Sequence, residues 1–579
     1  MDPSESLIAV ELERALESRT FARSARARDL LRYLIDSKRL GHAVRLKESA
    51  IALDVFSRDA ATYDSASDGI VRVSVNRLRE LLDRYYADEG RSSGVRFEIQ
   101  RGGYTPIIRR STPAGLPDSP RIAVLPLGNF TGDTQNEALC DGLTEDIIDA
   151  MTRVPEVRVI ARTSSFRFKG VALDVRNIAS ELSVDALLEG SVQIVGDRLR
   201  VTAQLILGSD GTHLWSHAFT FASSERRELQ DALIDIMLRS LKPGVPVLAA
   251  APTSAPAISP QAQSLIDQAR GLNVTQVPDN LTYAETLAQR ATELAPEHAD
   301  AWFVLAMVRY SRRSAFTSVA MHEGAGSATD ALQRALALDP ANAQAISLSA
   351  YMLITESLRW TEALQRARRA VSLAPNHAGV NGRLAFIQLC FGQFDESVQT
   401  YAHVFSLDPL APPARYHYAL ALAAAGRAEG ALRCIEDGRK VLGDSLLLQE
   451  TLCSILEMSG DIDTAASVSQ KALLQYPASI SIMMHAAYAL AAQGLLTKAR
   501  ALCERYWAAP TATLASQHYV RMYVESGGSD VDAFFSNAMA VAGNHEPQVM
   551  LLPSLPIFKK YHRDARWQIL LEKLQFPQR

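Results

Sequence analysis

A repeating pattern in the second half of the chain constrains the fold more than any other feature of the 579-residue sequence. Apolar helical stretches that end in Pro or Gly recur at steps of 44, 35, 34, 34 and 34 residues, at Pro296, Pro340, Pro375, Pro409, Gly443 and Pro477. One helix pair of this length cannot bury its apolar face alone, so neighbouring pairs must stack. The pattern therefore predicts a superhelix of helix pairs from residue 261 onwards.

The period and its small residues resemble the tetratricopeptide repeat. Ala331, Ala363 and Ala431 precede the end of the second helix in their pairs, and a Pro or Gly follows that end. The 44-residue step indicates an insertion near Ser314 to Gly326. The tail from Pro556 to Pro577 resembles the closing helix that often follows such arrays. The resemblance implies a tetratricopeptide solenoid that binds a protein or peptide on its concave face.

Two segments rich in Pro, Gly, Ser and Ala predict linkers, at residues 111–120 and 243–260. They separate a head (1–110), a middle domain (121–242) and the solenoid with its closing helix (261–579). With 47% hydrophobic and 21% charged residues and a net charge of -4, the chain is typical of a folded, water-soluble protein. We expect a multidomain, mainly α-helical architecture.

The cysteines and the lengths of the apolar stretches indicate the cellular compartment of the protein. The five cysteines never form a CxxC pair, which argues against a zinc finger or a disulfide scaffold. No stretch approaches about 18 uninterrupted apolar residues, and the start of the chain is acidic and amphipathic. We expect a cytoplasmic protein that neither spans a membrane nor is exported.

The middle domain alternates strand and helix signals. Strands are predicted at 121–127, 157–161, 186–194 and 198–207, and helices at 137–154 and 175–182. This order predicts a mixed sheet with helices on it. The motifs AVLPLGNFTGD, DGLTEDIIDAMTRV, VRVIARTSSFRFKG and IASELSVDALLEGSV resemble the TolB amino-terminal-like domain of bacterial signalling proteins, found there ahead of tetratricopeptide arrays. The resemblance implies an α/β fold and leaves the role of the domain open.

The head has the element order of a winged helix-turn-helix. Helices are predicted at 4–17, 24–37, 47–53 and 70–86, and a hairpin at 95–108 around Gly102-Gly103. Val71 to Arg79 (VRVSVNRLR) and Arg101 to Tyr104 (RGGY) resemble the recognition helix and the Gly-Tyr wing of the OmpR/PhoB-type DNA-binding domain. The resemblance implies binding of double-stranded DNA. Residues 69–110 carry nine Lys or Arg and five Asp or Glu, which favours a polyanionic partner without proving it.

Helical periodicity selects the candidate DNA contacts. At about 100° per residue, the apolar residues of the long helix form one stripe that must face the core: Val71, Val75, Leu78, Leu82 and Tyr85. The candidate contacts lie on the rest of the helix and on the wing: Arg72, Val73, Ser74, Asn76, Arg77, Arg79, Arg84, Arg101 and Tyr104.

Side-chain chemistry suggests a role for each group of contacts. In the major groove, Arg77 can form two hydrogen bonds to guanine, and Asn76 can form two hydrogen bonds to adenine. Arg72 and Arg79 flank the stripe, where they would hold phosphates or internal carboxylates. Arg101 at the hairpin tip can enter a narrow minor groove.

Enzymatic motifs are missing from the sequence. It contains no Gly-x-x-x-x-Gly-Lys-[Ser/Thr], no Gly-x-Gly-x-x-Gly and no Gly-x-Ser-x-Gly. His213 and His217 lie too far apart on a strand to chelate a metal easily. The acidic residues Asp141, Glu145, Asp146 and Asp149 look like a capping and solvated helix face. We expect no enzymatic activity, no cofactor and no metal.

Two functions compete. In the first, the chain is a DNA-binding transcriptional regulator whose repeats receive a protein or peptide input; pairing of two heads on tandem half-sites would make it a homodimer, a state that the sequence leaves open. In the alternative, it is a tetratricopeptide scaffold or signalling adaptor without DNA binding. Proteins with both the TolB-like and tetratricopeptide segments are often cyclases with a catalytic domain in place of this head.

Overall fold

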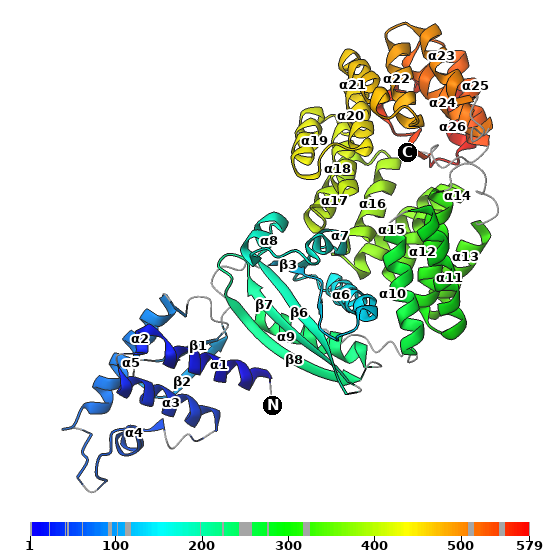
Figure 1. Ribbon diagram of the computed structural model, residues 1–579. Helices are drawn as coiled ribbons and strands as arrows, with labels where there is room; N and C mark the ends of the chain where they lie inside the picture. The colour runs from blue at the N-terminus through cyan, green and yellow to red at the C-terminus, as the bar shows by residue number, and fades with distance from the viewer. Residues whose placement is uncertain are drawn as a thin grey trace. The chain divides into compact units, whose positions relative to one another are not determined.

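The computed structural model describes residues 3–577 except 23, 41, 43–45, 61, 66, 88, 91–94, 101, 111–116, 118, 197, 223–224, 242–257, 275–276, 316–324, 508–513 and 544–549. The chain forms two compact units (Figure 1). The first comprises residues 1–122, 172–221 and 225–253, and the second comprises residues 123–171, 222–224 and 254–579.

The head consists of five helices followed by a hairpin. The helices are α1 (Pro3–Glu17), α2 (Arg19–Ala22), α3 (Ala25–Arg39), α4 (Glu48–Asp54) and α5 (Ile70–Ala87). Strands β1 (Val95–Ile99) and β2 (Pro106–Arg110) pair antiparallel, with Val95 opposite Arg110 and Ile99 opposite Pro106. The predicted order of helices and hairpin is present, with α2 as an additional short helix.

The apolar stripe of α5 forms the centre of the head. Its predicted members, Val71, Val75, Leu78, Leu82 and Tyr85, are all buried. They join α1, α3, α4 and β1 in one hydrophobic cluster. The predicted orientation of α5 is therefore confirmed, because a 3.6-residue period places these five side chains on one side of the helix.

Strands of the middle domain form a mixed sheet in the order β5-β3-β6-β7-β8, with β4 paired to β6. Their bounds are β3 (Arg121–Val124), β4 (Gly128–Asn129), β5 (Arg158–Val159), β6 (Ala186–Val195), β7 (Arg198–Leu207) and β8 (His213–Ala222). The predicted helices are α6 (Glu137–Thr152) and α8 (Val175–Leu182), and two further helices are α7 (Arg162–Ser165) and α9 (Arg226–Leu241). The predicted strands β6 and β7 pair antiparallel as a hairpin, with Val195 opposite Arg198.

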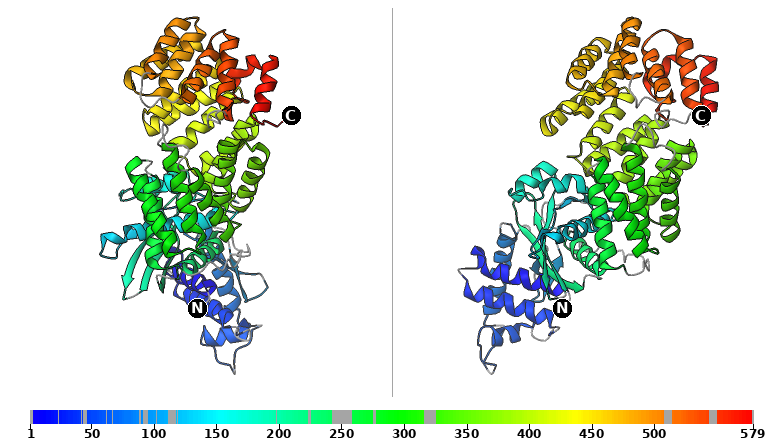
Figure 2. Two further views of the ribbon diagram at one scale, coloured as in Figure 1. Left: turned by 90° about the vertical axis from the view of Figure 1, so that its right-hand side faces the viewer. Right: turned by 45° about the vertical axis from the view of Figure 1, so that its right-hand side comes forward.

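The rest of the second unit is an array of helix pairs, stacked one against the next (Figures 1 and 2). We call the first helix of each pair the leading helix and the second the trailing helix. The pairs are α10 (Pro260–Val274) and α11 (Pro278–Leu294), α12 (Ala299–Ala315) and α13 (Ala325–Leu338), α14 (Ala343–Ser357) and α15 (Trp360–Leu373), α16 (Ala378–Cys390) and α17 (Phe394–Leu407), α18 (Pro412–Ala424) and α19 (Ala428–Leu442), α20 (Leu446–Ser459) and α21 (Ile462–Gln475), α22 (Ile480–Ala492) and α23 (Leu496–Trp507), and α24 (Leu514–Gly527) and α25 (Val531–Gly543).

The predicted repeat of helix pairs is confirmed by this array. Ala331, Ala363 and Ala431 are buried where neighbouring helices pack, since small side chains let two helices approach closely. The predicted insertion falls between α12 and α13, and residues 316–324 of it lie outside the described residues.

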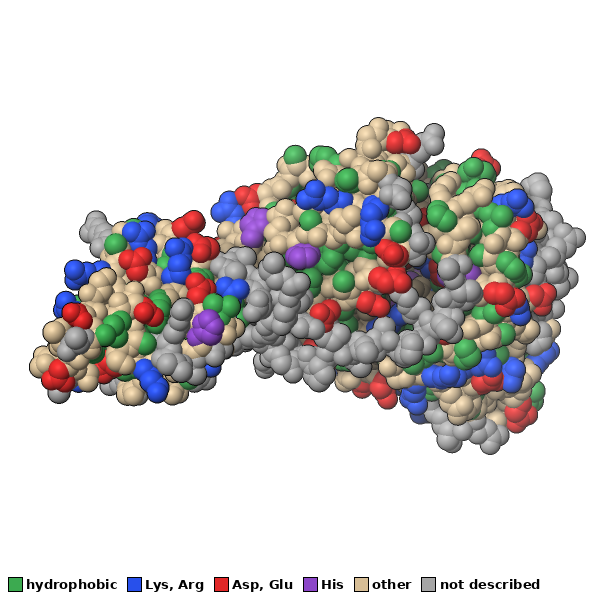
Figure 3. All heavy atoms as spheres, turned by 90° about the horizontal axis from the view of Figure 1, so that it is seen from below, with side chains coloured by type: hydrophobic (Ala, Val, Ile, Leu, Met, Phe, Trp, Pro, Cys, Tyr) green, Lys and Arg blue, Asp and Glu red, His purple; other side chains and the backbone are tan. Residues whose placement is uncertain are grey.

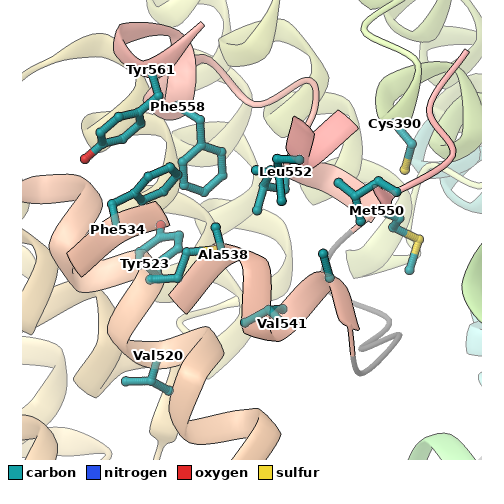
Figure 4. Close-up of a cluster of buried hydrophobic side chains, with 14 of the residues drawn as sticks. Cys390, Val520, Tyr523, Phe534, Ala538, Val541, Met550, Leu552, Phe558 and Tyr561 are labelled. Atoms are coloured by element: carbon teal, nitrogen blue, oxygen red, sulfur yellow. The ribbon is translucent and has the colours of Figure 1, made fainter. Parts of the chain in front are cut away.

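A core of aromatic residues joins the end of the array to its third pair. The rings of Phe534 and Tyr561 stack with centroids 3.7 Å apart, and Figure 4 shows Phe558 beside them. The indole Nε1 of Trp360, in α15, donates to the carbonyl of Leu574 at 2.8 Å. The segment after α25, with the 3-10 helix η5 (Pro556–Tyr561) and the predicted closing helix α26 (Ala565–Lys573), thus packs back onto residues more than 200 positions earlier.

Three leading helices share a buried polar cluster. Glu457 of α20 accepts from the Tyr523 hydroxyl of α24 at 2.5 Å and lies 2.9 Å from Nδ1 of His485 in α22. Burial alone would lower the pKa of His485, but the Glu457 carboxylate outweighs it, and the pKa is raised above its usual value.

This cluster makes the stability of the array depend on pH. A histidine whose pKa is higher in the folded than in the unfolded chain stabilises the fold fully below the unfolded value of about 6.5, and the contribution is lost as pH rises through the folded value. Wild type should therefore unfold at a higher urea concentration than His485→Asn. The difference between the two midpoints should be largest at pH 5.5 and should shrink progressively up to pH 9. Equal differences at all pH values would contradict the ion pair.

Candidate functional site

The outward side of α5 is the first candidate site. Its side chains Val73, Asn76, Arg77, Glu80 and Arg84 are exposed, as the helical period predicts, and we call them the outer face of α5. Val73 is 69% exposed, an unusual state for a large apolar side chain. Arg77 Nη1 lies 2.9 Å from Oε2 of Glu80 in an exposed pair. Ser74 lies between stripe and outer face and is half-buried.

Arg79 connects α5 to the hairpin. Its Nε donates to the carbonyl of Ile99 at 2.8 Å, and its Nη2 donates to the carbonyls of Gln100 at 2.6 Å and Gly103 at 2.8 Å. Its Nη1 donates to Oδ1 of Asn76 at 2.5 Å. A guanidinium has five N–H donors in a planar fork, so one side chain can satisfy this whole set of carbonyls. Arg79 therefore holds the turn of the hairpin beside the outer face.

Arg72 and Tyr104 converge on Glu48 of α4. The Tyr104 hydroxyl donates to Oε2 of Glu48 at 2.7 Å, and burial together with this bond raises the pKa of Tyr104 to about 12. Arg72 Nη2 donates to the carbonyl of Ser65 at 2.7 Å, and its Nε lies 3.8 Å from Oε1 of Glu48. Both predicted contact residues thus have partners within the head, whereas Arg101 lies outside the described residues.

Charges of both signs cover the head. On the face in Figure 3, its Lys and Arg side chains alternate with Asp and Glu side chains. Some of these opposite charges form exposed ion pairs, such as Arg32 with Glu13 and Arg77 with Glu80. Exposed ion pairs contribute only about 0–1 kcal/mol, so these arginines can exchange their partners for phosphate at little cost.

A second candidate surface lies where the leading helices begin. The turns before α14, α16 and α18 bind residues 145–167 of the same unit, and we call residues 342–344, 376–377 and 407–410 the turn row. Asn376 is the central contact: its backbone N–H donates to the carbonyl of Thr152, and its Nδ2 donates to the carbonyls of Val154 at 2.9 Å and Val157 at 2.7 Å.

The next turn of the row binds α7. The hydroxyl of Ser164 donates to Oδ1 of Asp408 at 2.6 Å and accepts from the N–H of Leu410 at 2.9 Å. The N–H of Ala161 donates to the carbonyl of Leu407 at 2.7 Å. Burial raises the pKa of Asp408 to about 6, although the bond from Ser164 opposes this shift.

Asp149 of α6 takes part in this contact instead of lying on a solvated face. Asp149 accepts from Nε2 of Gln344 at 2.7 Å and pairs with Arg153 at 2.7 Å. Burial would raise the pKa of Asp149, but Arg153 and His377 hold it below its usual value. Glu145 pairs with Arg162 at 3.2 Å. Sequence periodicity could not reveal the contact with Gln344, because that residue lies 195 positions from Asp149 in the chain.

Two further features of the array are a row of aromatic side chains and a cavity. Tyr310, Tyr351 and Phe386 form a partly exposed aromatic ladder across three leading helices, with centroid distances of 5.9 and 5.5 Å. A cavity of about 940 Å³ lies at the ends of α16, α18 and α20, and its walls include Asp395 and Trp567. Its volume is within the range of small-ligand sites.

The described residues bear on metal binding and on membrane insertion. No group of three or more His, Cys, Asp or Glu side chains there could hold a metal ion. In the same part of the chain, no helix combines the length and apolar character needed to cross a bilayer. The five cysteines form no disulfide.

Comparison with known proteins supports only a coarse assignment. No family model matches the chain. A protein of Rhizobium meliloti (strain 1021) named "Putative adenylate cyclase 3" is 39% identical over 137 residues, which are 24% of this chain and 23% of that protein. This chain therefore spans about a quarter of the length of the curated relative it matches.

Solved structures with partial likeness are tetratricopeptide and pilus-biogenesis proteins. A tetratricopeptide repeat protein from Parabacteroides merdae has a TM-score of 0.32 at 14% identity, over 47% of this chain and 98% of that one. The pilus biogenesis factor PilW has a TM-score of 0.31 at 16% identity, over 38% and 94%. These scores are too low to carry an argument about function, so the array's tetratricopeptide-type fold rests on its own helix pairs.

The contact of Asn376 can be tested by substitution. Asn376→Ala removes the side-chain donor shared by the buried carbonyls of Val154 and Val157, and Val154 keeps only the longer bond from the Val157 N–H at 3.4 Å. The loss costs on the order of 1–3 kcal/mol. Hydrogen exchange of residues 145–167 should accelerate about tenfold or more, because this segment opens more often. Ser479→Ala, which removes the cap of α22 outside the turn row, should destabilise the array without a selective effect on residues 145–167. Equal acceleration in both variants would contradict a specific contact.

Proposed function

We propose that this chain is a protein-interaction scaffold whose tetratricopeptide-type array binds a protein or peptide partner. The observation that carries the proposal is the stack of helix pairs, since such stacks create extended surfaces that single domains of this size lack. The turn row supports it further. There the array already holds a polypeptide segment through backbone carbonyls and a serine hydroxyl.

The aromatic ladder is the proposed input surface. Aromatic side chains bury much apolar area at a low cost in side-chain entropy, and they dominate many protein interfaces. Tyr310, Tyr351 and Phe386 come from three consecutive leading helices, so an extended ligand can touch several of them at once.

The cellular setting is inferred from two features. The five unpaired cysteines favour a reducing compartment, and we propose the cytoplasm. The stretch of 137 residues shared with a protein named as an adenylate cyclase favours signalling. Together with the TolB-like motifs, it supports an adaptor of the type associated with cyclases, without catalysis by this chain.

Affinity capture tests the scaffold function. Immobilised full-length chain should enrich specific proteins from a lysate of the source organism, and Tyr351→Ala should reduce their recovery about tenfold because it interrupts the ladder. Tyr283→Ala on the trailing helix α11 is the matched control: that tyrosine is 57% exposed, and its loss should leave recovery unchanged. Recovery that is equal for all three proteins would exclude the ladder as the input surface.

We also propose that the head is a winged helix that binds double-stranded DNA, which would make the scaffold a transcriptional regulator. The specific observation is the outer face of α5, where Val73, Asn76, Arg77 and Arg84 are exposed beside a hairpin tied to the same helix by Arg79. A helix of this kind fits the major groove while the hairpin approaches the backbone. Homodimerisation on tandem half-sites belongs to the same proposal.

Gel shifts test DNA binding. Full-length chain should bind a genomic fragment pool at moderate salt, and Arg77→Ala combined with Arg84→Ala should weaken binding about tenfold or more. The plot of log affinity against log salt should flatten by roughly 0.9 for each phosphate contact removed. Arg26→Ala combined with Arg32→Ala on α3 removes the same number of exposed arginines and should bind as wild type does. If the double variant of α5 binds as tightly as wild type, the scaffold function stands alone.

A further inference from the structure

We propose that strand β8 is the surface through which two copies of this chain pair, so that the sheet of one copy continues into the sheet of the other. The partner surface is the same strand, His213–Ala222, paired antiparallel with itself about a two-fold axis. The inference goes beyond the functions proposed above. It holds whether or not the head binds DNA, because its tests use no DNA.

Strand β8 forms one edge of the sheet in the middle domain. It follows β7 at the end of the strand order, and in the part of the chain that the structure describes no further strand pairs with its other side. An edge strand presents a row of unpaired backbone N–H and C=O groups along that side, and such a row is a template for another strand. The backbone of β8 is therefore ready to receive a strand from a partner.

The sequence of β8 lacks the features that usually protect such an edge. Proteins keep edge strands short or place charged residues or Pro on them, whereas β8 has 10 residues and contains no Lys, Arg, Asp, Glu or Pro. At the opposite edge of the sheet, β5 has only 2 residues, one of which is Arg158. The adjoining carbonyl of Val157 accepts from Asn376. The sheet is thus protected at the β5 edge and unprotected at the β8 edge.

Side chains in the middle of β8 are accessible. Ser216, His217 and Ala218 are all exposed, although two of them are small. Arg198 of β7 donates to the carbonyl of Thr220 at 3.2 Å. This contact lies nearer the end of the strand, so the middle of β8 remains open to a partner.

Backbone geometry limits how β8 can pair with its own copy. In an antiparallel ladder, two opposite residues either both exchange hydrogen bonds or both do not. The direction of these bonds alternates along a strand, so the two-fold axis must pass through a residue and not between two residues. The longest overlaps pair residues 213–221 about an axis at His217, or residues 214–222 about an axis at Ala218.

The side chains of β8 complement those of a second copy in both registers. Alternate residues share one face of a strand, and the rings of His217 and Phe219 lie with centroids 4.7 Å apart on such a face. Trp215 lies opposite Phe219 of the second copy with the axis at His217, and opposite Phe221 of the second copy with the axis at Ala218. An aromatic cross-strand pair therefore forms on each side of the axis, and such pairs stabilise a sheet.

Charge and symmetry also favour a second copy as the occupant. Because β8 contains no Lys, Arg, Asp or Glu, two copies of the strand bring no permanent like charges together. An axis through the strand makes the contact isologous, which is the arrangement of the two-fold dimers that dominate among protein oligomers.

Charge placed at residue 217 tests the pairing. This residue lies opposite its own copy with the axis at His217 and diagonal to it with the axis at Ala218, so like charges repel there and opposite charges attract. In sedimentation experiments, the wild-type full-length chain should shift from monomer to dimer as its concentration rises. His217→Lys and His217→Glu should each weaken the dimer about tenfold or more. An equimolar mixture of the two variants should recover dimers that contain one copy of each.

His213→Lys and His213→Glu are the matched controls. His213 is an exposed histidine on the same face of the same strand, but its own copy lies at the far end of the paired strands. A mixture of these two variants should therefore dimerise no better than either variant alone. Hydrogen exchange gives a second readout: the amides of residues 213–222 in wild type should exchange more slowly as the fraction of dimer rises.

Three results would overturn the inference. They are a wild-type chain that stays monomeric over about a hundredfold range of concentration, a dimer that neither variant of His217 weakens, and a mixture that dimerises no better than its components. A variant that lost its dimer only because it was less stable would give the third result, since mixing cannot restore its fold. Failure of the chain to bind DNA would leave the pairing through β8 unchanged.

Discussion

Helix pairs that cannot bury their apolar faces alone hold most of this molecule together. Each pair must pack against the next, and small residues such as Ala363 and Ala431 let the helices approach closely. The leading helices consequently begin at regular steps of 34 or 35 residues from Ala343 to Ile480. This regularity aligns the turns before them, and the turn row binds residues 145–167 as a result.

Polar side chains with several hydrogen-bond partners shape the remaining surfaces. Asn376 and Ser164 satisfy groups of the backbone and side chains across the turn row, so burial of this segment leaves the carbonyls of Val154 and Val157 with partners. In the head, the guanidinium of Arg79 serves three carbonyls of the hairpin and the oxygen of Asn76. The five donors of one guanidinium thus connect α5 to the hairpin.

Sequence reasoning succeeded where a local period governs the structure. The buried stripe of α5 and the exposed positions of Val73, Asn76 and Arg77 follow from the 3.6-residue turn. Sequence reasoning was less informative about the partners of three other residues. Arg72 bonds the carbonyl of Ser65, Arg79 bonds the hairpin carbonyls, and Tyr104 bonds Glu48. Residue type marks them as donors, but only the folded backbone determines which acceptors come within reach.

The amino-acid sequence by itself determined the succession of elements: helices and a hairpin, then strands and helices, then helix pairs at a period of 34. These depend on hydrophobic periodicity and on turn residues, which act over a few positions. Tertiary structure alone decided that Asp149 of α6 meets the array, that Trp360 bonds the carbonyl of Leu574, and that Arg79 bonds the carbonyls of the hairpin. Hydrogen bonds between distant residues depend on a few tenths of an ångström, and such distances exist only once the chain has folded.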